Sequence, residues 1–402
     1  MIIENLPKIF QEAAPLIKRL ESAGFKAYFV GGSVRDLVLG RPIHDVDIAT
    51  SAYPAEVKKV FPVTIDTGIQ HGTVTVKNED KFYEITTFRT ESTYQDFRRP
   101  DHVEFVQNLS EDLKRRDFTI NALAMNAEGE IIDHFGGLED LKNKIIRAVG
   151  KPQERFHEDA LRMMRAVRFV SQLGFELEDA TKTAINENRQ LLHKIAVERI
   201  REEFLKLGLG PDSKLGFRAL IETELVDDLP LLEGKSSLLK NYLTLKFYPT
   251  TEATFWALII VLIKLNTAEI GHFLREWKNS NEINHQVQEI IQCFDAVTEG
   301  ELSNRQLFDF GMTTIASTID LANILGEPIN GVVLIDRYNN LPLKTSKELV
   351  IDGKFLMENF QIKAGPKIGQ LLMKILDAVL LGDVKNNQES IKKYVQKITS
   401  VV

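Results

Sequence analysis

The sequence predicts an α+β protein, in which a small domain with a mixed β-sheet is followed by a long helical part. Strand-like and helix-like runs alternate over roughly the first 150 residues, a pattern typical of domains built on a sheet. Beyond that point the strand signals fade, and helical runs follow one another between Gly or small polar breaks. The chain of 402 residues is also too long for one ordinary core, which indicates roughly two to four domains.

The elements of the predicted sheet follow one another closely in the sequence. KAYFV (26–30) is β-prone and ends at two glycines, and SVRDLVLG (33–40) then has a helical pattern. DVDIAT (45–50) is predicted to form the edge of a strand, while GTVTV (72–76) and KFYEITTFR (81–89) alternate as half-buried strands do.

Helical patterns dominate the rest of the chain. The runs RFHEDALRMMRAVRFVSQLGF (155–175), EDATKTAINENRQLLHKI (178–195) and AVERIREEFLKLGLG (196–210) come first. The most apolar window, ATFWALIIVLIKL (253–265), contains Lys264 and is too short to span a bilayer. It therefore predicts a buried helix, and no membrane segment is expected.

Composition and charge limit the possible functions. Apolar residues make up 44% and charged residues 27% of the chain, as in an ordinary globular protein. The single cysteine, Cys293, excludes an intramolecular disulfide and a Cys-rich zinc site, which fits a reducing compartment such as the cytoplasm. A net charge of −7 argues against a protein that coats nucleic acid with its whole surface. Residues 147–168 nevertheless hold six bases against three acids, so a local basic strip needs an explanation.

The turn after the first strand is a candidate phosphate site. A strand that ends in Gly31-Gly32 and turns into a helix leaves backbone N–H groups pointing outward, where they can hold an anion. Glycine allows close approach to the backbone, and Arg35 in the first helical turn can add a charge-assisted bond. Taken alone, however, a double glycine is more often a simple tight turn. Gly32 and Arg35 are the residues predicted to bind phosphate.

Asp45 and Asp47 are candidate metal ligands. They are two residues apart, so on an extended backbone both side chains leave the same face of the sheet. Two adjacent carboxylates suit Mg²⁺, which takes its remaining ligands from phosphates and water. Glu84, on the strand at 81–89, is a candidate third carboxylate. A lone Asp-x-Asp is as often a solvated turn, but its closeness to the glycine turn favours metal-assisted nucleotidyl transfer.

One pair of residues at the start of this segment is also typical of a second class of enzyme. His44-Asp45 also resembles the His-Asp doublet of metal-dependent phosphohydrolases. Those enzymes need further histidines at helical spacing, and the other seven histidines of this chain are scattered. A transferase is therefore favoured over a hydrolase, and His44 is predicted to be a loop residue.

Four motifs occur in a specific order along the chain. They are GGSVRDLVLGRPIHDVDIAT (31–50), RRDFTINALAMN (115–126), DHFGGLEDLKNKIIRAVG (133–150) and ERFHEDALRMMRAVRF (154–169). In this order they resemble the motif series of the bacterial class II tRNA nucleotidyltransferases, the CCA-adding enzymes of the DNA polymerase beta superfamily. The resemblance is dense over the first half of the chain. In the second half it depends on general features such as GPKIG (365–369) before a helix.

The resemblance implies an architecture and a reaction. The expected domains are a catalytic head at 1–146, a nucleotide-selecting neck at 147–207, a body at 208–295 and a tRNA-binding tail at 296–402. The expected reaction is template-independent addition of CCA to the 3′ end of tRNA from CTP and ATP, with release of pyrophosphate. Members of the family are often dimers, so a homodimer is also an expectation.

Two further segments take their roles from this resemblance. In the family the second arginine of the RRD motif binds the incoming nucleotide, which assigns that role to Arg116. From the sequence, Asp117 is a plausible N-cap of a helix starting near it. RTESTYQDFRRPD (89–101) is long, polar and charged, which is consistent with a mobile flap. In the family this region affects the switch from C to A addition.

A basic helix face completes the predicted site. Over 159–168, helical geometry places Asp159, Arg162, Arg165 and Arg168 on one side and mostly apolar residues on the other. Most charged helix faces are simply exposed to solvent. On such faces acidic and basic residues usually alternate, because opposite charges three or four residues apart stabilise the helix, and three arginines with one aspartate do not follow this pattern.

Base chemistry offers an alternative explanation for the acid and the first arginine. Cytosine and adenine both present an amine beside a ring acceptor, which a carboxylate and a guanidinium can bind together. Guanine and uracil would leave both protein groups facing like partners, at about 1–3 kcal/mol for each unpaired group. In the family, residues at the positions of Asp159 and Arg162 select the base, and Arg165 and Arg168 also contact nucleotide.

Other functions remain open from the sequence. A bacterial poly(A) polymerase shares the head motifs, and CC-only or A-only adding enzymes share nearly all of them. From a different class, the head could be a catalytically silent nucleotide-binding or RNA-binding module. The intact pair of carboxylates argues against that alternative.

Overall fold

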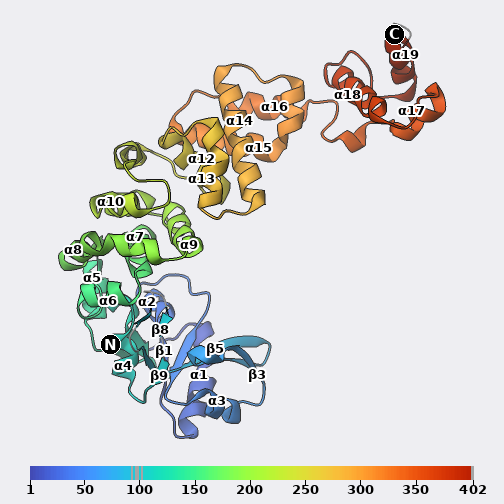
Figure 1. The fold of residues 1–402 in the computed structure, drawn as a ribbon. Coiled ribbons are helices and arrows are strands. Elements are labelled where there is room, and N and C mark those ends of the chain that lie inside the picture. Colours follow the sequence, from blue (N-terminus) through green and yellow to red (C-terminus); the bar gives the residue numbers. More distant parts are fainter. Residues whose placement is uncertain (92–93, 96–98, 101–102, 400–402) are drawn as a thin grey trace. The chain divides into compact units, whose positions relative to one another are not determined.

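The computed structural model describes residues 1–91, 94–95, 99–100 and 103–399 (Figure 1). The chain divides into two compact units. We call them the N-terminal unit, residues 1–243 with 276–278, and the C-terminal unit, residues 244–275 with 279–402. The N-terminal unit contains the sheet, and the C-terminal unit is helical in its described part. The predicted α+β class is confirmed.

A seven-stranded mixed sheet forms the first half of the N-terminal unit, in the order β11-β10-β1-β2-β5-β4-β3. Its strands are β1 (Ala27–Val30), β2 (Asp47–Thr50), β3 (Thr64–Gly68), β4 (Thr73–Asn78), β5 (Lys81–Thr87), β10 (Leu123–Met125) and β11 (Ile131–Asp133). The pairing of β2 with β5 is parallel, and the other pairs are antiparallel. The strands predicted at 26–30, 45–50, 72–76 and 81–89 are all present.

Short strand pairs accompany the sheet. They are β6 (Arg89–Glu91) with β9 (Val103–Phe105), β7 (Tyr94–Gln95) with β8 (Arg99–Pro100), and the parallel pair of β12 (Ile145–Ile146) with β13 (Glu176–Leu177). Within the segment predicted to form a flap, residues 92–93, 96–98 and 101 lie outside the described residues.

Alternating residues of the strands are buried on opposite faces of the sheet. On one face Phe29 meets Phe10 of α1 (Lys8–Ser22), with ring centroids 5.0 Å apart. On the other face Val30 and Ala49 form a buried cluster with Leu113 of α4 (Leu109–Lys114). Helices therefore cover both faces, and this packing fixes the strand ends that carry the predicted carboxylates.

The remaining helices of the N-terminal unit include those of the predicted runs at 33–40, 155–175, 178–195 and 196–210, with breaks, and others that were not predicted individually. They are α2 (Gly32–Val38), α3 (Pro54–Val60), α5 (Gly137–Asn143), α6 (Pro152–Glu158), α7 (Leu161–Leu173), α8 (Asp179–Asn188), α9 (Val197–Gly208), α10 (Ser213–Glu222) and α11 (Ser236–Leu239). The run predicted at 155–175 is divided into α6 and α7 by an extended residue, Asp159, with φ −138° and ψ 103°.

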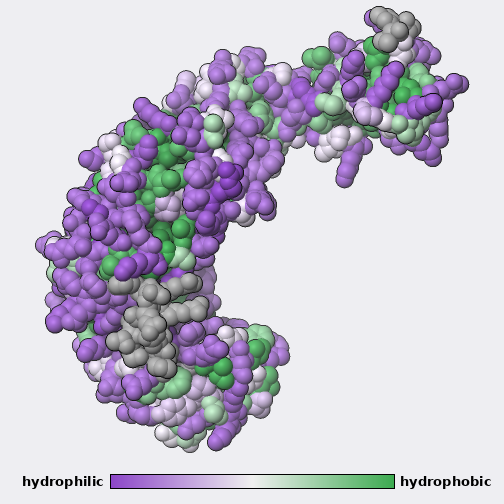
Figure 2. Space-filling view, in the orientation of Figure 1, coloured by the Kyte–Doolittle hydropathy of each residue, from purple (hydrophilic) through white to green (hydrophobic). Residues whose placement is uncertain are grey.

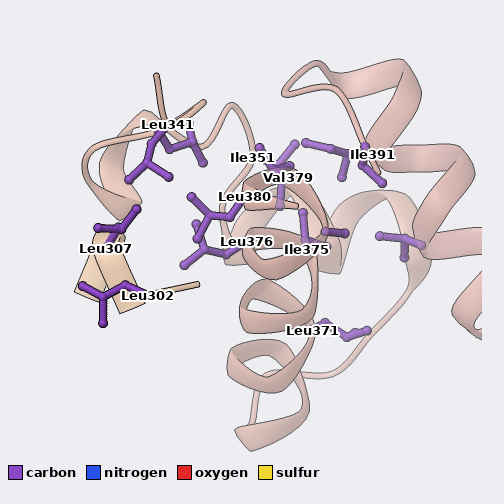
Figure 3. Close-up of a cluster of buried hydrophobic side chains, with 14 of the residues drawn as sticks. Leu302, Leu307, Leu341, Ile351, Leu371, Ile375, Leu376, Val379, Leu380 and Ile391 are labelled. Carbon is purple, nitrogen blue, oxygen red and sulfur yellow. The ribbon is translucent and has the colours of Figure 1, made fainter. Parts of the chain in front are cut away.

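The C-terminal unit is held together by apolar packing. Its helices are α12 (Glu252–Leu262), α13 (Thr267–Glu276), whose last residue is assigned to the N-terminal unit, α14 (Asn281–Glu299), α15 (Asn304–Leu325), α16 (Gly331–Asn339), α17 (Gly353–Phe360), α18 (Pro366–Leu380) and α19 (Gln388–Thr399). Figure 3 shows α18 at the centre of a buried cluster that includes Ile375 and Val379. The apolar window at 253–265 forms α12, which is buried as predicted. Within the described residues, no helix is long and apolar enough to cross a membrane.

Candidate active site

One cavity of about 470 Å³ in the N-terminal unit gathers almost all of the predicted site residues. It lies where the ends of β1 and β2 face α7. Its lining residues are Gly31, Gly32, Arg35, Asp47, Arg115, Arg116, Asp117, Asn121, Asp159, Arg162, Arg165, Arg168, Phe169 and Gln172. We call it the nucleotide cavity. Of the predicted site residues, Asp45 and the candidate third carboxylate Glu84 are not part of its lining.

The glycine turn is shaped by its closeness to an arginine. Gly31 has φ 74° and caps the start of α2, a backbone conformation that favours glycine. A Cβ atom at Gly31 would lie 2.9 Å from Nη1 of Arg116, so a side chain would displace that guanidinium. The turn and the second arginine of RRD, distant in sequence, therefore form one wall of the cavity.

Arg35 is held by side chains on two elements. Its Nε and Nη2 donate to Asp36 at 3.0 and 2.8 Å, and its Nη1 donates to Oδ1 of Asn121 at 2.7 Å. A guanidinium has five N–H donors, so these three bonds do not exhaust it. Arg35 is thus fixed in the cavity wall with donors left for an anion.

The two aspartates differ in their backbone settings. Asp47 is the first residue of β2 and pairs with Val30, whereas Asp45 precedes the strand. Both line a second cavity of about 450 Å³, together with Glu84, and Asp47 lines both cavities. Desolvation, the charge of Asp45 and the charge of Glu84 raise the pKa of Asp47, while Arg116 acts in the opposite direction. A carboxylate in this setting gains from a nearby cation.

The donor atoms of these carboxylates determine which metal ion they could hold. Within the described residues, no three or more His, Cys, Asp and Glu side chains come together as a group that could hold a metal ion. Mg²⁺, however, is commonly bound by one or two carboxylates plus substrate phosphates and water. The oxygen-only pair Asp45 and Asp47, at the edge of a cavity of about 470 Å³ that also holds arginines for phosphate groups, fits that coordination.

Arg116 has an unfilled hydrogen-bonding capacity. Its Nη2 donates to Oδ2 of Asp112 at 3.3 Å, while its buried Nε has no partner in the part of the chain that the structure describes. A buried donor without a partner costs free energy, which an anion in the cavity would recover. The carboxyl group of Asp112 is buried, which raises its pKa, but Arg115 and Arg116 outweigh burial and hold that pKa below its usual value.

The prediction that a helix starts near Asp117 is wrong. The chain there forms a single 3₁₀ turn, Thr119–Asn121, which leads into β10. The carboxylate of Asp117 instead accepts hydrogen bonds from Arg165 at 2.8 Å and from Asn121 at 3.0 Å. Burial alone would raise the pKa of Asp117, but Arg165 and these hydrogen bonds lower it far below its ordinary value. Asp117 is therefore an ionised anchor for residues of the cavity.

Asp159 lines the cavity, but from a different position than predicted. The residue lies in the extended break before α7 rather than on the face of that helix. Its Oδ1 accepts from the backbone N–H of Leu161 at 3.0 Å, and its Oδ2 pairs with Arg199 of α9 at 3.3 Å. The break arises because this carboxylate caps the backbone at the start of α7, which offsets the lost helical bonds.

The arginines of α7 do not form a solvated face. Arg162 and Arg168 are each only 7% exposed, so that interpretation is excluded for them. Arg162 pairs with Glu158 at 2.8 Å, Arg165 with Asp117, and Arg168 with Glu203 of α9. The negative charges that balance these arginines, which the sequence of α7 itself lacks, thus come mostly from other elements of the fold.

An aromatic ring supports the same arginines. The guanidinium carbon of Arg168 lies 3.9 Å from the centroid of Phe169, and those of Arg35 and Arg165 lie 5.2 and 5.5 Å from it. Such stacking holds the planar groups in place at little entropic cost. Phe169, together with Asn121, Asp117, Arg199 and Glu203, was missed as part of the site. The Asp-x-x-x-Asn spacing at 117–121 was the one local signal available for two of them.

Comparison with known families identifies the same regions. Residues 27–147 match the family model of the poly A polymerase head domain. Residues 174–234 match a model described as a probable RNA and SrmB-binding site of polymerase A. Residues 247–395 match one described as a putative tRNA nucleotidyltransferase domain 2.

Individual proteins resemble the chain over almost its full length. The CCA-adding enzyme of Lactobacillus gasseri is 59% identical over 394 residues, 98% of this chain and 99% of that protein. That of Lactobacillus johnsonii is 58% identical, again over 98% and 99%. The crystal structure of the Bacillus stearothermophilus CCA-adding enzyme in complex with CTP matches with a TM-score of 0.90 and 42% identity, covering 98% and 99%.

Proposed function

Because this chain belongs to the family of CCA-adding enzymes, the tRNA nucleotidyltransferases, we propose that the nucleotide cavity is its active site. The enzyme adds CCA to the 3′ end of tRNA with CTP and ATP and releases pyrophosphate. One observation supports the location above all. Asp47, the phosphate-binding candidates and the base-selecting candidates line the same 470 Å³ space, which suits one nucleoside triphosphate.

The triphosphate is bound by the cationic wall of the cavity. Gly32 allows the phosphates close to the backbone, while Arg35 and Arg116 donate to them. The unpaired Nε of Arg116 and the free donors of Arg35 support this role. Positioning and charge neutralisation account for most of the catalysis of an in-line phosphoryl transfer, so fixed arginines are suited to it.

Asp45 and Asp47 hold the divalent metal that nucleotidyltransferases of this family use, and we propose Mg²⁺. When bound, the ion supplies Lewis-acid chemistry at the reacting phosphate. The raised pKa of Asp47 supports the assignment, because two neighbouring carboxylates and desolvation make its negative charge unfavourable without a cation. The charge of Glu84 also raises the pKa of Asp47, and Glu84 remains a candidate for a third metal-binding carboxylate.

Asp159 and Arg162 select the base. A carboxylate that accepts from the exocyclic amine and a guanidinium that donates to the ring nitrogen accept cytosine and adenine but not uracil or guanine. The pairing of Asp159 with Arg199 supports this role, because it fixes the position of a carboxylate whose oxygens can accept from the exocyclic amine of the base. Arg165 and Arg168 contact the nucleotide from the same side of α7.

The product formed from a tRNA that lacks its CCA end tests the function. With CTP and ATP together, we expect three added nucleotides in the order C, C, A. With CTP alone we expect two, and with GTP or UTP almost none. Incorporation of A alone into any RNA would indicate a poly(A) polymerase, and products limited to CC or to A would indicate the partial enzymes.

Two variants test the site separately from the overall function. Asp159→Asn gives the position an amide that both donates and accepts, so discrimination against UTP and GTP should fall by about 10-fold or more. Glu154→Gln, an exposed carboxylate of α6 that pairs with Lys151 and does not line the cavity, serves as the comparison for local disturbance. Unchanged discrimination in Asp159→Asn would contradict the selection role.

Several expectations stay predictions. We place the enzyme in the cytoplasm on the basis of its single unpaired cysteine and its tRNA substrate. The division into head, neck, body and tail, with tRNA bound by the tail, is proposed from the family. A homodimer is likewise an expectation from the family.

A further inference from the structure

The second cavity, with a volume of about 450 Å³, has a chemistry different from that of the nucleotide cavity. Its lining consists of Ile9, His44, Asp45, Val46, Asp47, Lys81, Phe82, Tyr83 and Glu84. It lies where β2 and β5 separate, since their paired residues begin only at Ile48 and Ile85. We call it the crevice. Among the described residues, Asp47 is the one that lines both the crevice and the nucleotide cavity.

We propose that the crevice binds the 3′-terminal nucleotide of the tRNA acceptor, with its base stacked on Phe82. The inference relies on the proposed function, because it takes the nucleotide cavity as the triphosphate site. It adds a second substrate subsite and a residue that binds the acceptor.

The direction of the reaction gives the first argument. In an in-line transfer the attacking oxygen and the leaving pyrophosphate lie on opposite sides of the phosphorus atom. The arginines that suit the pyrophosphate are all on the nucleotide-cavity side of Asp47. The acceptor hydroxyl must then approach from the other side of Asp47, which is the side of the crevice.

Charge gives the second argument. Three carboxylates, those of Asp45, Asp47 and Glu84, line the crevice, and none of the arginines that the structure describes does. A triphosphate would be repelled there, whereas the reacting end of an acceptor is a neutral hydroxyl. Lys81 at the rim is paired with Glu12 across an exposed contact, which competes weakly with a phosphodiester that follows the terminal nucleotide.

An exposed aromatic side chain gives the third argument. Phe82 is 59% exposed, and it lies two residues before Glu84 on β5, so both side chains leave the same face of the sheet. Figure 2 shows hydrophobic surface over β3 and β5 of the unit. The two residues are about 7 Å apart along the strand, a spacing that a single nucleotide can cover with its base and sugar.

Stacking also meets a requirement of the reaction. The acceptor ends in a variable nucleotide before the first addition, and in C before the second and third. Hydrogen bonds to a base edge would favour one of these ends. An aromatic face accepts all of them, because every base has a π-face.

The test uses the full-length enzyme and three tRNA acceptors, which end before CCA, after C and after CC. Phe82→Ala should lower kcat/KM for all three acceptors by a similar factor of about 10- to 100-fold. The Kd for CTP should stay within twofold of the wild-type value. Phe82→Trp should restore most of the loss. Phe247→Ala, which removes another exposed phenylalanine (62% exposed) from the C-terminal unit, should have no such effect.

An acceptor with an abasic 3′-terminal nucleotide makes the test specific. It should lose the same factor with the wild-type enzyme, and Phe82→Ala should cause no additional loss with it. Equal kcat/KM in Phe82→Ala and wild type, or an additive loss with the abasic acceptor, would overturn the proposal. A weakened Kd for CTP would assign Phe82 to the triphosphate site and overturn it too. Failure of the wild type to extend any acceptor would instead refute the proposed function.

Discussion

The two units differ in where they bury charge. Among the described residues, the buried charged side chains all belong to the N-terminal unit: Arg35, Asp112, Asp117, Asp140, Arg162, Arg168, Glu203 and Asp228. In the described part of the C-terminal unit the buried polar side chains are the uncharged Thr254, Asn279, Thr314 and Thr318. Its core is otherwise a cluster of aliphatic and aromatic residues (Figure 3).

This difference indicates that the N-terminal unit contains the functional site, whereas the C-terminal unit is built for stability. Burying a charge costs several kcal/mol unless it is paired and hydrogen-bonded, so buried ion pairs are poor devices for stability alone. In the N-terminal unit six of these charged residues line the nucleotide cavity or lie directly against its arginines: Arg35, Asp112, Asp117, Arg162, Arg168 and Glu203. Apolar packing in the C-terminal unit gives shape and stability without such a cost.

The largest expected effect comes from the residue shared by the two cavities. Asp47→Asn removes a carboxylate from the metal site, so the transfer rate should fall by about 10³-fold or more. Because the raised pKa of Asp47 means that its charge is unfavourable in the folded state, stability should be unchanged or higher. Single-turnover kinetics and thermal unfolding measure the two effects. Asp66→Asn, in β3 at the far end of the same sheet, is the matched control, and equal rates in both variants would contradict the assignment.

The second largest effect is expected in the apolar core of the C-terminal unit, where a substitution should change stability but not nucleotide binding. Ile375 of α18 is fully buried, so Ile375→Ala should destabilise the C-terminal unit by about 3 kcal/mol. The Kd for CTP should not change, because no residue of that cluster lines the nucleotide cavity. Denaturant unfolding and CTP titration measure these quantities. Weaker binding of CTP, measured under conditions where the variant is fully folded, would show that the core of the C-terminal unit and the nucleotide cavity are not independent.

A smaller effect with a defined pH dependence is expected at Asp117. Asp117→Asn leaves Arg165 without its main partner and should cost about 2 kcal/mol at pH 7, discounted for the partial exposure of that arginine. The folded-state pKa of Asp117 is lowered, so its stabilisation is complete above the unfolded pKa of about 4 and is lost as the pH falls further. Unfolding measured from pH 7 to pH 3 should show the two proteins converging in acid. A constant difference would show that the charge is not the cause.

The smallest effect is expected at Arg199, a residue outside the nucleotide cavity that influences base selection through Asp159. Arg199 does not line the nucleotide cavity but pairs with Asp159 at 3.3 Å. Arg199→Ala should loosen that carboxylate and reduce discrimination between CTP and UTP by about 10-fold, or about 1.4 kcal/mol. The comparison of kcat/KM for the two nucleotides measures it, with Lys206→Ala on the same helix as control. A loss of kcat/KM that is equal for CTP and UTP would indicate a general structural role.

Local patterns were sufficient to predict most of the elements. The alternation in β4 and β5 and the glycine turn before α2 follow from interactions between near neighbours, so the sequence reveals them. The break at Asp159 was missed because a continuous amphipathic pattern predicts one helix, while a single side chain that caps the backbone can end it. The supposed helix at Asp117 failed for a similar reason, since its carboxylate serves the cavity instead of a helix start.

By itself, the sequence determined which chemical groups are present and how neighbours in the chain are spaced: two carboxylates, a glycine turn and arginines on one helix. The tertiary structure decided their partners. Arg35 meets Asn121 across 86 residues, Arg165 meets Asp117 across 48, and Arg199 meets Asp159 across 40. Such contacts depend on the path of the whole backbone, because periodicity and propensity act only over a few residues. For the same reason only the fold could place Asp47 between two cavities of opposite character.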